Sequence, residues 1–112
     1  MDMAVDRFGR LVLAGRKGLW RFERDQNWQP VSLPGLDKGM SLTRICFDNQ
    51  GRMYLGTSRG LLLVNGDIHH FIRPVDGIGG TEVSSLMIDS GGFLWVGFRS
   101  EGLSLSPIDQ LW

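Results

Sequence analysis

The feature that most constrains the fold of this chain is a segment that recurs three times at nearly constant spacing. Residues 6–14 align with residues 48–56 at an offset of 42. A third copy, residues 89–97, follows at an offset of 41. Self-similarity at a period of about 20–50 residues is typical of arrays built from one small structural unit. The sequence therefore predicts three copies of one unit.

Each copy is rich in β-forming residues and carries the same Asp-x-x-Gly turn. The predicted strands before the turn are 3–5, 45–47 and 86–88, those after it are 10–14, 52–56 and 93–97, and third strands follow at 19–22, 61–64 and 103–105. A fourth, outer strand is predicted at 28–32 and 68–72. No stretch of a dozen residues has helical periodicity. The predicted fold class is all-β.

Four short strands in a unit of about 40–45 residues are typical of a β-propeller blade, a four-stranded antiparallel sheet. Blades pack face to face, which explains the consecutive apolar residues at 61–64. We therefore predict blade 1 at 1–40 with a truncated first strand, blade 2 at 41–80, and blade 3 at 81–112 without its outer strand.

The predicted ring is incomplete. A chain of 112 residues holds about 2.7 blades, whereas propellers have roughly four to eight. The terminal blades would then expose apolar sheet faces, which predicts self-association through those faces. Two interpretations remain open: the chain is a segment of a longer propeller, or several copies close one ring, with about 5.4 blades from two copies and about 8 from three.

The turn motif resembles a known family. The second copy contains Asp48-Asn-Gln-Gly51-Arg-Met-Tyr54-Leu-Gly-Thr57 and then Gly60-Leu61. This is similar to the two-component regulator propeller repeat, D-x-x-G-x-L-W-[IV]-G-T-x-x-G-L, and the resemblance covers essentially residues 1–106. Val12 and Tyr54 stand where the family has Trp.

The resemblance implies a sensing role. Propellers of this family form the extracytoplasmic part of membrane receptors, ahead of a membrane helix and a histidine kinase or diguanylate cyclase, and in many gut bacteria their ligands are oligosaccharides. We therefore expect a non-catalytic, ligand-sensing segment of a bacterial receptor with a periplasmic location, although the 112 residues contain neither a signal peptide nor an output module. The alternative is a short module that self-assembles into a closed ring as a scaffold or lectin-like binder.

Composition excludes several other classes. Twelve Lys and Arg balance twelve Asp and Glu, which argues against nucleic acid or an anionic membrane as a partner, because such binding depends on excess basic residues. The longest aliphatic run, residues 61–64, is far too short to span a membrane. A single cysteine, Cys46, provides neither an internal disulfide nor a thiolate metal cluster.

No enzyme, cofactor or metal site is predicted. Asp6, Asp48 and Asp89 occupy the same place in each copy and are interpreted as turn-formers. His69 and His70 are adjacent in a strand, so their side chains point to opposite faces and cannot bind one ion together. The glycine-rich stretch 77–80 precedes a strand rather than the helix that a phosphate site requires.

One candidate ligand site remains. The loops between the second and third strands carry cations in every copy, at Arg16-Lys17, Arg59 and Arg99. In a propeller these loops lie on the same face as the loops 33–41 and 73–82 that join the blades. A ring of cations there would bind an acidic ligand such as a uronate-bearing glycan, with a nearby aromatic ring for sugar stacking. The candidate residues are Lys17, Arg59, Arg99 and Phe98. The alternative is that the cations are solvated rim residues and the aromatics are core.

Overall fold

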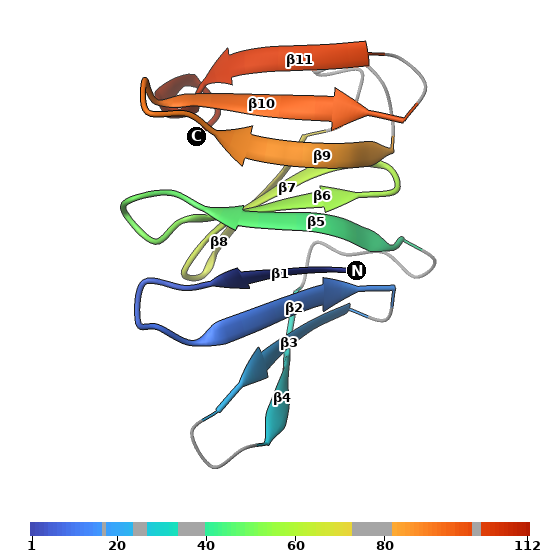
Figure 1. Cartoon of the computed structure of the whole chain (residues 1–112), viewed down its shortest axis with the longest axis vertical. Helices are drawn as coiled ribbons and strands as arrows, with labels where there is room; N and C mark the ends of the chain where they lie inside the picture. Colours follow the sequence, from blue (N-terminus) through green and yellow to red (C-terminus); the bar gives the residue numbers. More distant parts are fainter. Residues whose placement is uncertain (17, 24–26, 34–39, 73–81, 100–101) are drawn as a thin grey trace.

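The computed structural model describes residues 1–16, 18–23, 27–33, 40–72, 82–99 and 102–112. They form three antiparallel sheets that follow one another along the long axis of the molecule (Figure 1). Sheet 1 contains β1 (Asp2–Val5), β2 (Leu11–Gly15), β3 (Gly18–Phe22) and β4 (Trp28–Val31). Sheet 2 contains β5 (Leu42–Phe47), β6 (Met53–Thr57), β7 (Gly60–Asn65) and β8 (Ile68–Ile72). Sheet 3 contains β9 (Val83–Ile88), β10 (Phe93–Phe98) and β11 (Gly102–Pro107), and a short 3-10 helix, Ile108–Gln110, follows it.

Consecutive strands pair within each sheet, so the predicted all-β class is confirmed. The observed strands lie where the sequence placed them, except that β5 and β9 each begin three residues earlier than predicted. The polar residues Thr43, Arg44, Ser84 and Ser85 interrupt the apolar pattern there, but their backbones still lie along β6 and β10. Among the described residues, no helix has the length and hydropathy needed to cross a membrane.

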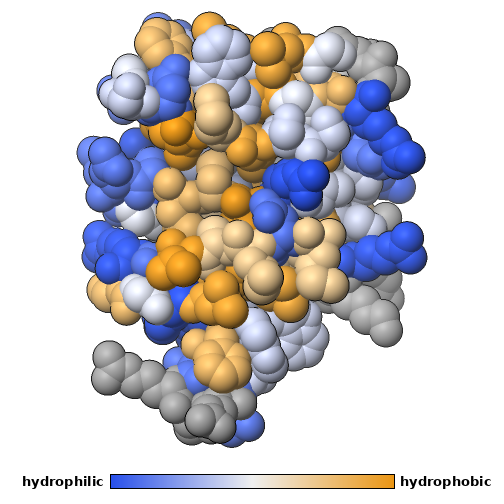
Figure 2. Space-filling view, viewed as in Figure 1, coloured by the Kyte–Doolittle hydropathy of each residue, from blue (hydrophilic) through white to orange (hydrophobic). Residues whose placement is uncertain are grey.

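The first strands of the three sheets, β1, β5 and β9, lie side by side on one face of the molecule (Figure 1). Side chains join them to each other. The Asp2 carboxylate accepts a hydrogen bond from the Ile45 backbone N–H at 3.0 Å, and the Thr43 hydroxyl donates to the Val83 carbonyl at 2.6 Å. Figure 2 views this face and shows apolar residues along its middle and hydrophilic residues at the two edges, where the turns lie.

Two apolar cores fill the spaces between the sheets. The core between sheets 1 and 2 is formed by Val12, Ala14, Leu19, Leu42, Ile45, Met53, Leu55, Leu62 and Val64. The core between sheets 2 and 3 is formed by Tyr54, Leu61, Leu63, Ile72, Val83, Leu94, Val96, Phe98 and Ile108. Alternate residues of β6 and β7 enter opposite cores, so both faces of sheet 2 are covered. This explains why the sequence of β7 is apolar at consecutive positions.

Gly56 sets how closely sheet 3 approaches sheet 2. A Cβ atom at Gly56 would lie 2.5 Å from the Val83 Cγ1 atom, so only a glycine fits without a shift of β9. The equivalent residue of sheet 1 is Ala14, which is fully buried against sheet 2. Ala14 and Gly56 therefore occupy the same place between successive sheets, and the two contacts differ there by the one methyl group of Ala14.

Candidate ligand-binding site

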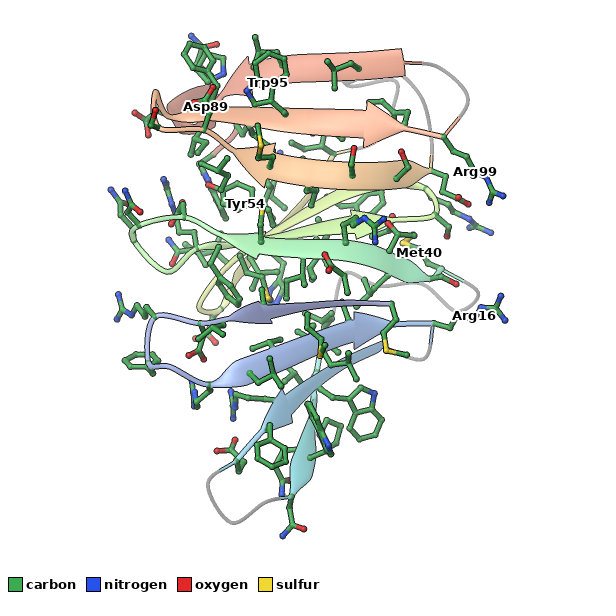
Figure 3. The ribbon with its side chains drawn as sticks, viewed as in Figure 1. Arg16, Met40, Tyr54, Asp89, Trp95 and Arg99 are labelled. Carbon is green, nitrogen blue, oxygen red and sulfur yellow. The ribbon has the colours of Figure 1, made fainter. Side chains whose placement is uncertain are left out.

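The turns that follow β2, β6 and β10 all lie on one edge of the molecule, where Figure 3 labels Arg16, Met40 and Arg99. Backbone hydrogen bonds hold two of these turns to the residues that precede the first strand of the same sheet. The Ser58 N–H donates to the Ser41 carbonyl at 2.9 Å, and the Arg99 N–H donates to the Glu82 carbonyl at 3.0 Å. The edge is therefore built from equivalent parts of successive repeats.

A hollow of about 460 Å³ opens on this edge, which is within the size range of small-ligand sites. We call it the arginine hollow. Its polar lining includes Arg16, Arg44, Arg99, Ser41, Ser58 and Glu82. Three guanidinium groups and one carboxylate give the lining an excess of positive charge, and serine hydroxyls add neutral donors and acceptors. Such a lining suits a ligand that carries a carboxylate, sulfate or phosphate group.

The three arginines are held to different degrees. Arg44 is fixed against the neighbouring inner strand, since its Nε–H donates to the Ser84 carbonyl at 2.8 Å. Arg99 forms an ion pair with Glu82 at 3.1 Å, but its side chain is 77% exposed, so that pair is weak and exchangeable. Arg16 is exposed, and no ion pair joins it to another described residue. Arg44 thus provides an anchored donor group, while Arg16 and Arg99 are free to move toward a ligand.

The structure brings only part of the predicted set together. Arg99 lines the arginine hollow, whereas the exposed Arg59 does not, and Lys17 lies outside the described residues. Phe98 was expected to offer a stacking surface for sugars, and this expectation is wrong. Its side chain is 7% exposed and packs in the core between sheets 2 and 3, because alternation along β10 directs it toward sheet 2.

Sequence reasoning missed Arg44. Arg44 lies four residues before the turn aspartate Asp48, inside the strand β5, so no loop motif marks it. The available signal is a polar residue at the equivalent position of all three first strands, Asp2 in β1, Arg44 in β5 and Ser85 in β9. Polar residues at this one position in all three copies indicate a shared edge that is not part of the core.

The opposite edge of the molecule carries the three turn aspartates, and Asp48 shows their role. Its Oδ1 atom accepts backbone hydrogen bonds from Gln50 and Arg52, both at 2.9 Å. Its Oδ2 atom accepts from the Arg52 Nε–H at 2.6 Å and the Tyr54 hydroxyl at 2.7 Å. With four donors on two oxygens, the carboxylate closes the turn and has little capacity left for a ligand.

The same turn recurs in the other two copies. Asp6 accepts from the Phe8 and Arg10 backbones at 2.9 and 2.8 Å, and Asp89 accepts from the Trp95 Nε1–H at 2.8 Å. The final glycine of each turn has a φ near +80°, at Gly9, Gly51 and Gly92, which an L side chain adopts only with strain. These contacts support the interpretation of the three aspartates as turn-formers.

Two of the turn aspartates, Asp48 and Asp89, accept a hydrogen bond from the side chain six residues later, and this contact was not foreseen. Tyr54 stands where the family repeat has Trp, yet its hydroxyl reaches the carboxylate as the Trp95 indole does in the third copy. Burial of Asp48 disfavours its charge, but the hydrogen bonds from Tyr54 and Arg52 outweigh that effect and hold its pKa below the usual 3.8. Burial and the nearby Asp48 carboxylate raise the pKa of Tyr54, so it remains a donor at neutral pH.

The histidines and the cysteine were considered as possible metal or reactive sites. Among the residues that the structure describes, no three His, Cys, Asp or Glu side chains gather as a metal-binding group. His69 contacts the Asp67 carbonyl of its own turn at 3.1 Å. Burial raises the pKa of the Cys46 thiol to about 12, so it is an unreactive packing residue. The glycine-rich stretch 77–80 lies outside the described residues.

No protein-family model matches this sequence, and no curated protein matches it. Among solved structures, the fold is similar to the extracellular domain of a protein assigned as a hybrid two-component system in B. thetaiotaomicron. The TM-score is 0.78 at 18% sequence identity, and the match covers 98% of this chain but 16% of that domain. At this identity the likeness shows a shared fold, and this chain spans about one sixth of the length of that structure.

Proposed function

We propose that this chain is part of a ligand-sensing β-propeller in a bacterial signal-transduction receptor of the two-component or diguanylate cyclase type. It acts outside the cytoplasm, in the periplasm, and is non-catalytic. Its three sheets are successive blades, with β1, β5 and β9 innermost. The similarity in fold to an extracellular domain of a protein assigned as a hybrid two-component system supports this role, as does the resemblance of the turn motif to the two-component regulator propeller repeat.

The observation that carries the ligand proposal is the arginine hollow. Two equivalent turns supply Arg16 and Arg99, and the inner strand β5 supplies Arg44, around a space of about 460 Å³. Arg44 has already lost part of its conformational freedom, because its Nε–H is bound to the Ser84 carbonyl. Binding of a ligand to Arg44 therefore costs less side-chain entropy than binding to a freely rotating arginine. We propose an acidic oligosaccharide as the ligand, bound through carboxylate–guanidinium pairs and serine hydroxyls.

Calorimetric titration with tetragalacturonate, compared with the neutral maltotetraose, tests this proposal. We expect the acidic tetrasaccharide to bind more tightly, with an affinity that falls as salt is added, since exposed charges are screened. Arg16→Gln and Arg99→Gln should each weaken binding about tenfold, because a hydrogen bond to a charged group contributes about 1.5 kcal/mol or more.

Arg59→Gln is the matched control. Arg59 is exposed and comes from an equivalent turn, but it does not line the arginine hollow. We expect the affinity of the Arg59→Gln variant for tetragalacturonate to stay within twofold of that of the unmodified chain. Equal binding of both tetrasaccharides, or an equal loss with Arg59→Gln and Arg99→Gln, would overturn the proposed site.

A further inference from the structure

A second pocket, of about 210 Å³, lies between sheets 1 and 2 on the edge that carries the turn aspartates. We call it the Val12 pocket. Its lining combines apolar side chains of both sheets, among them Val12, Leu19 and Met53, with charged side chains of the first turn and of β3. No described residue lines both this pocket and the arginine hollow. The two spaces are therefore separate candidates for ligand binding.

The repeat explains why space is left at this place. Val12 occupies the position of Tyr54 in the second copy and of Trp95 in the third. In those copies the ring brings a donor to Oδ2 of the turn aspartate, at 2.7 Å from the Tyr54 hydroxyl to Asp48 and at 2.8 Å from the Trp95 Nε1–H to Asp89. Figure 3 labels Tyr54, Asp89 and Trp95. Valine has neither the ring nor the donor, so the first copy lacks both.

Asp6 accordingly has an acceptor atom with capacity to spare. Its Oδ1 atom accepts from the Phe8 and Arg10 backbones, as the other turn aspartates do. Among the described residues, its Oδ2 atom accepts only the Arg10 Nε–H, at 2.9 Å, whereas Oδ2 of Asp48 accepts two donors. The Asp6 side chain is 10% exposed and lines the Val12 pocket. A ligand in the pocket can therefore donate to this carboxylate.

The residue across from Val12 also differs from its counterpart. Arg21 pairs with Val12 as the buried Leu63 pairs with Tyr54, so a guanidinium group replaces an isobutyl group beside the pocket. The Arg21 Nε–H donates to the Glu23 carboxylate at 2.7 Å, and its terminal nitrogens form no hydrogen bond to another described residue. They are therefore available to an anionic group of a ligand.

Two further arginines add to the positive charge of the lining. Arg7 and Arg10 both lie over the Phe8 ring, with their guanidinium carbons 4.9 and 5.1 Å from its centroid. These cation–π contacts keep both groups beside the Val12 pocket. Three guanidinium groups then face one carboxylate among the lining residues. This balance favours a ligand with a negative charge.

We propose that the Val12 pocket binds a small aromatic carboxylic acid whose ring carries a hydrogen-bond donor. The ligand ring takes the place that Tyr54 and Trp95 fill in the other copies, its hydroxyl or N–H donates to Asp6, and its carboxylate binds Arg21. A protein cavity of about 150 Å³ holds benzene, so the Val12 pocket, at about 210 Å³, has room for a ring with a short substituent. It is smaller than the roughly 300–1,000 Å³ of drug-sized sites, which distinguishes its ligand from the oligosaccharide proposed for the arginine hollow.

Calorimetric titration of the full chain with para-hydroxyphenylacetate tests the proposal, with two matched ligands. Phenylacetate lacks the ring donor and para-cresol lacks the carboxylate. Each should bind about tenfold more weakly, because each loses one hydrogen bond to a charged group. Equal affinity of phenylacetate would refute the contact with Asp6. Failure of both para-hydroxyphenylacetate and indoleacetate, which carries the Trp95 ring, to bind would overturn the proposal, whatever the outcome with tetragalacturonate.

Val12→Tyr gives the first copy the ring and hydroxyl of the second. Binding of para-hydroxyphenylacetate should be lost, while the Tm measured by circular dichroism should rise, because the new ring fills the pocket and its hydroxyl donates to Asp6. A substitution that merely damaged the fold would lower both affinity and Tm. A lower Tm would therefore show that the pocket does not admit a ring and would sink the proposal.

Arg21→Leu restores the residue of the second copy and tests the carboxylate contact. This variant should bind para-hydroxyphenylacetate about tenfold more weakly, with the affinity for para-cresol unchanged. Arg59→Leu is the matched control, since Arg59 is exposed and does not line the Val12 pocket, and its affinity for both ligands should equal that of the unmodified chain. An equal loss with Arg21→Leu and Arg59→Leu would contradict the role of Arg21.

Discussion

Replacing Tyr54 by Phe tests whether the turn carboxylates depend on the aromatic side chain six residues later. Tyr54 is fully buried, and its hydroxyl lies 2.7 Å from Asp48 Oδ2 and 3.0 Å from Trp112 Nε1. Phenylalanine keeps the ring but removes this hydroxyl. It therefore deprives a buried carboxylate of a donor and leaves the Trp112 N–H without its acceptor.

The size of the destabilisation depends on the charge of the acceptor, the Asp48 carboxylate. A hydrogen bond to a charged group contributes about 1.5–3 kcal/mol, and Arg52 remains at 2.6 Å to satisfy part of Asp48. We expect Tyr54→Phe to lower the free energy of unfolding by about 2 kcal/mol at pH 7, which corresponds to a fall in Tm of about 8–16 °C for a domain of this size.

The assay is urea unfolding followed by tryptophan fluorescence, at one fixed protein concentration because association would shift the transition. Trp112→Phe is the comparison variant: it removes the neutral donor to Tyr54 and leaves a smaller ring against Arg52 and Tyr54, and it should cost about 1 kcal/mol. In a double-mutant cycle, Tyr54→Phe should have a much smaller effect in an Asp48→Ala background.

The pH dependence gives a second check. The folded-state pKa of Asp48 is lowered from 3.8, so the stabilisation from its charge is present above that value and is lost as pH falls through the folded-state pKa. The difference in the free energy of unfolding between Tyr54→Phe and the unmodified chain should persist from pH 7 to 5 and shrink below about pH 3.8. A difference of less than about 0.5 kcal/mol at pH 7 would refute this account of the turn.

Three further predictions concern packing, acid stability and the thiol. Gly56→Ala should destabilise the chain by about 1–3 kcal/mol because the added Cβ meets Val83 at 2.5 Å, whereas Gly15→Ala, with nothing within 4 Å, should leave unfolding by urea nearly unchanged. Acidification should reduce the unmodified chain's unfolding free energy most steeply below about pH 3.8, because all three turn aspartates have lowered pKa values. An abrupt fall in the free energy of unfolding between pH 6 and 5 would contradict this role of the aspartates. Cys46, whose thiol pKa is raised to about 12, should react with Ellman's reagent at pH 8 far more slowly in the folded chain than in urea. Equal rates would show that the thiol is accessible.

The repeat determined most of the strand pattern. An Asp-x-x-Gly turn followed by a β-rich run specifies a hairpin locally, since the aspartate binds the backbone of its own turn and the glycine adopts positive φ. The consecutive apolar residues of β7 indicated that both faces of sheet 2 are covered. These properties depend on residues close in the sequence, so the sequence alone was enough to predict them.

The candidate site needed the tertiary structure. Sequence placed Arg59 and Phe98 beside Arg99, but the pleat of β10 turns Phe98 into the core, and the arginine hollow excludes Arg59. Arg44 joins Arg99 only because β5 and β9 lie side by side, with the Arg44 Nε–H bound to the Ser84 carbonyl 40 residues away. Which side chains share an edge depends on the stacking of the sheets, a long-range arrangement that the local pattern does not encode.

Whether a property of this chain could be predicted therefore depends on how far apart in the sequence the interacting residues lie. Sequence by itself determined the all-β class, the repeat and the turn role of Asp6, Asp48 and Asp89, because each is decided by contacts within a few residues. Only the tertiary structure decided that the Tyr54 hydroxyl binds Asp48 as the Trp95 indole binds Asp89, that Arg44 lines the arginine hollow, and that Phe98 is buried between sheets 2 and 3. Those outcomes depend on how one sheet packs against the next.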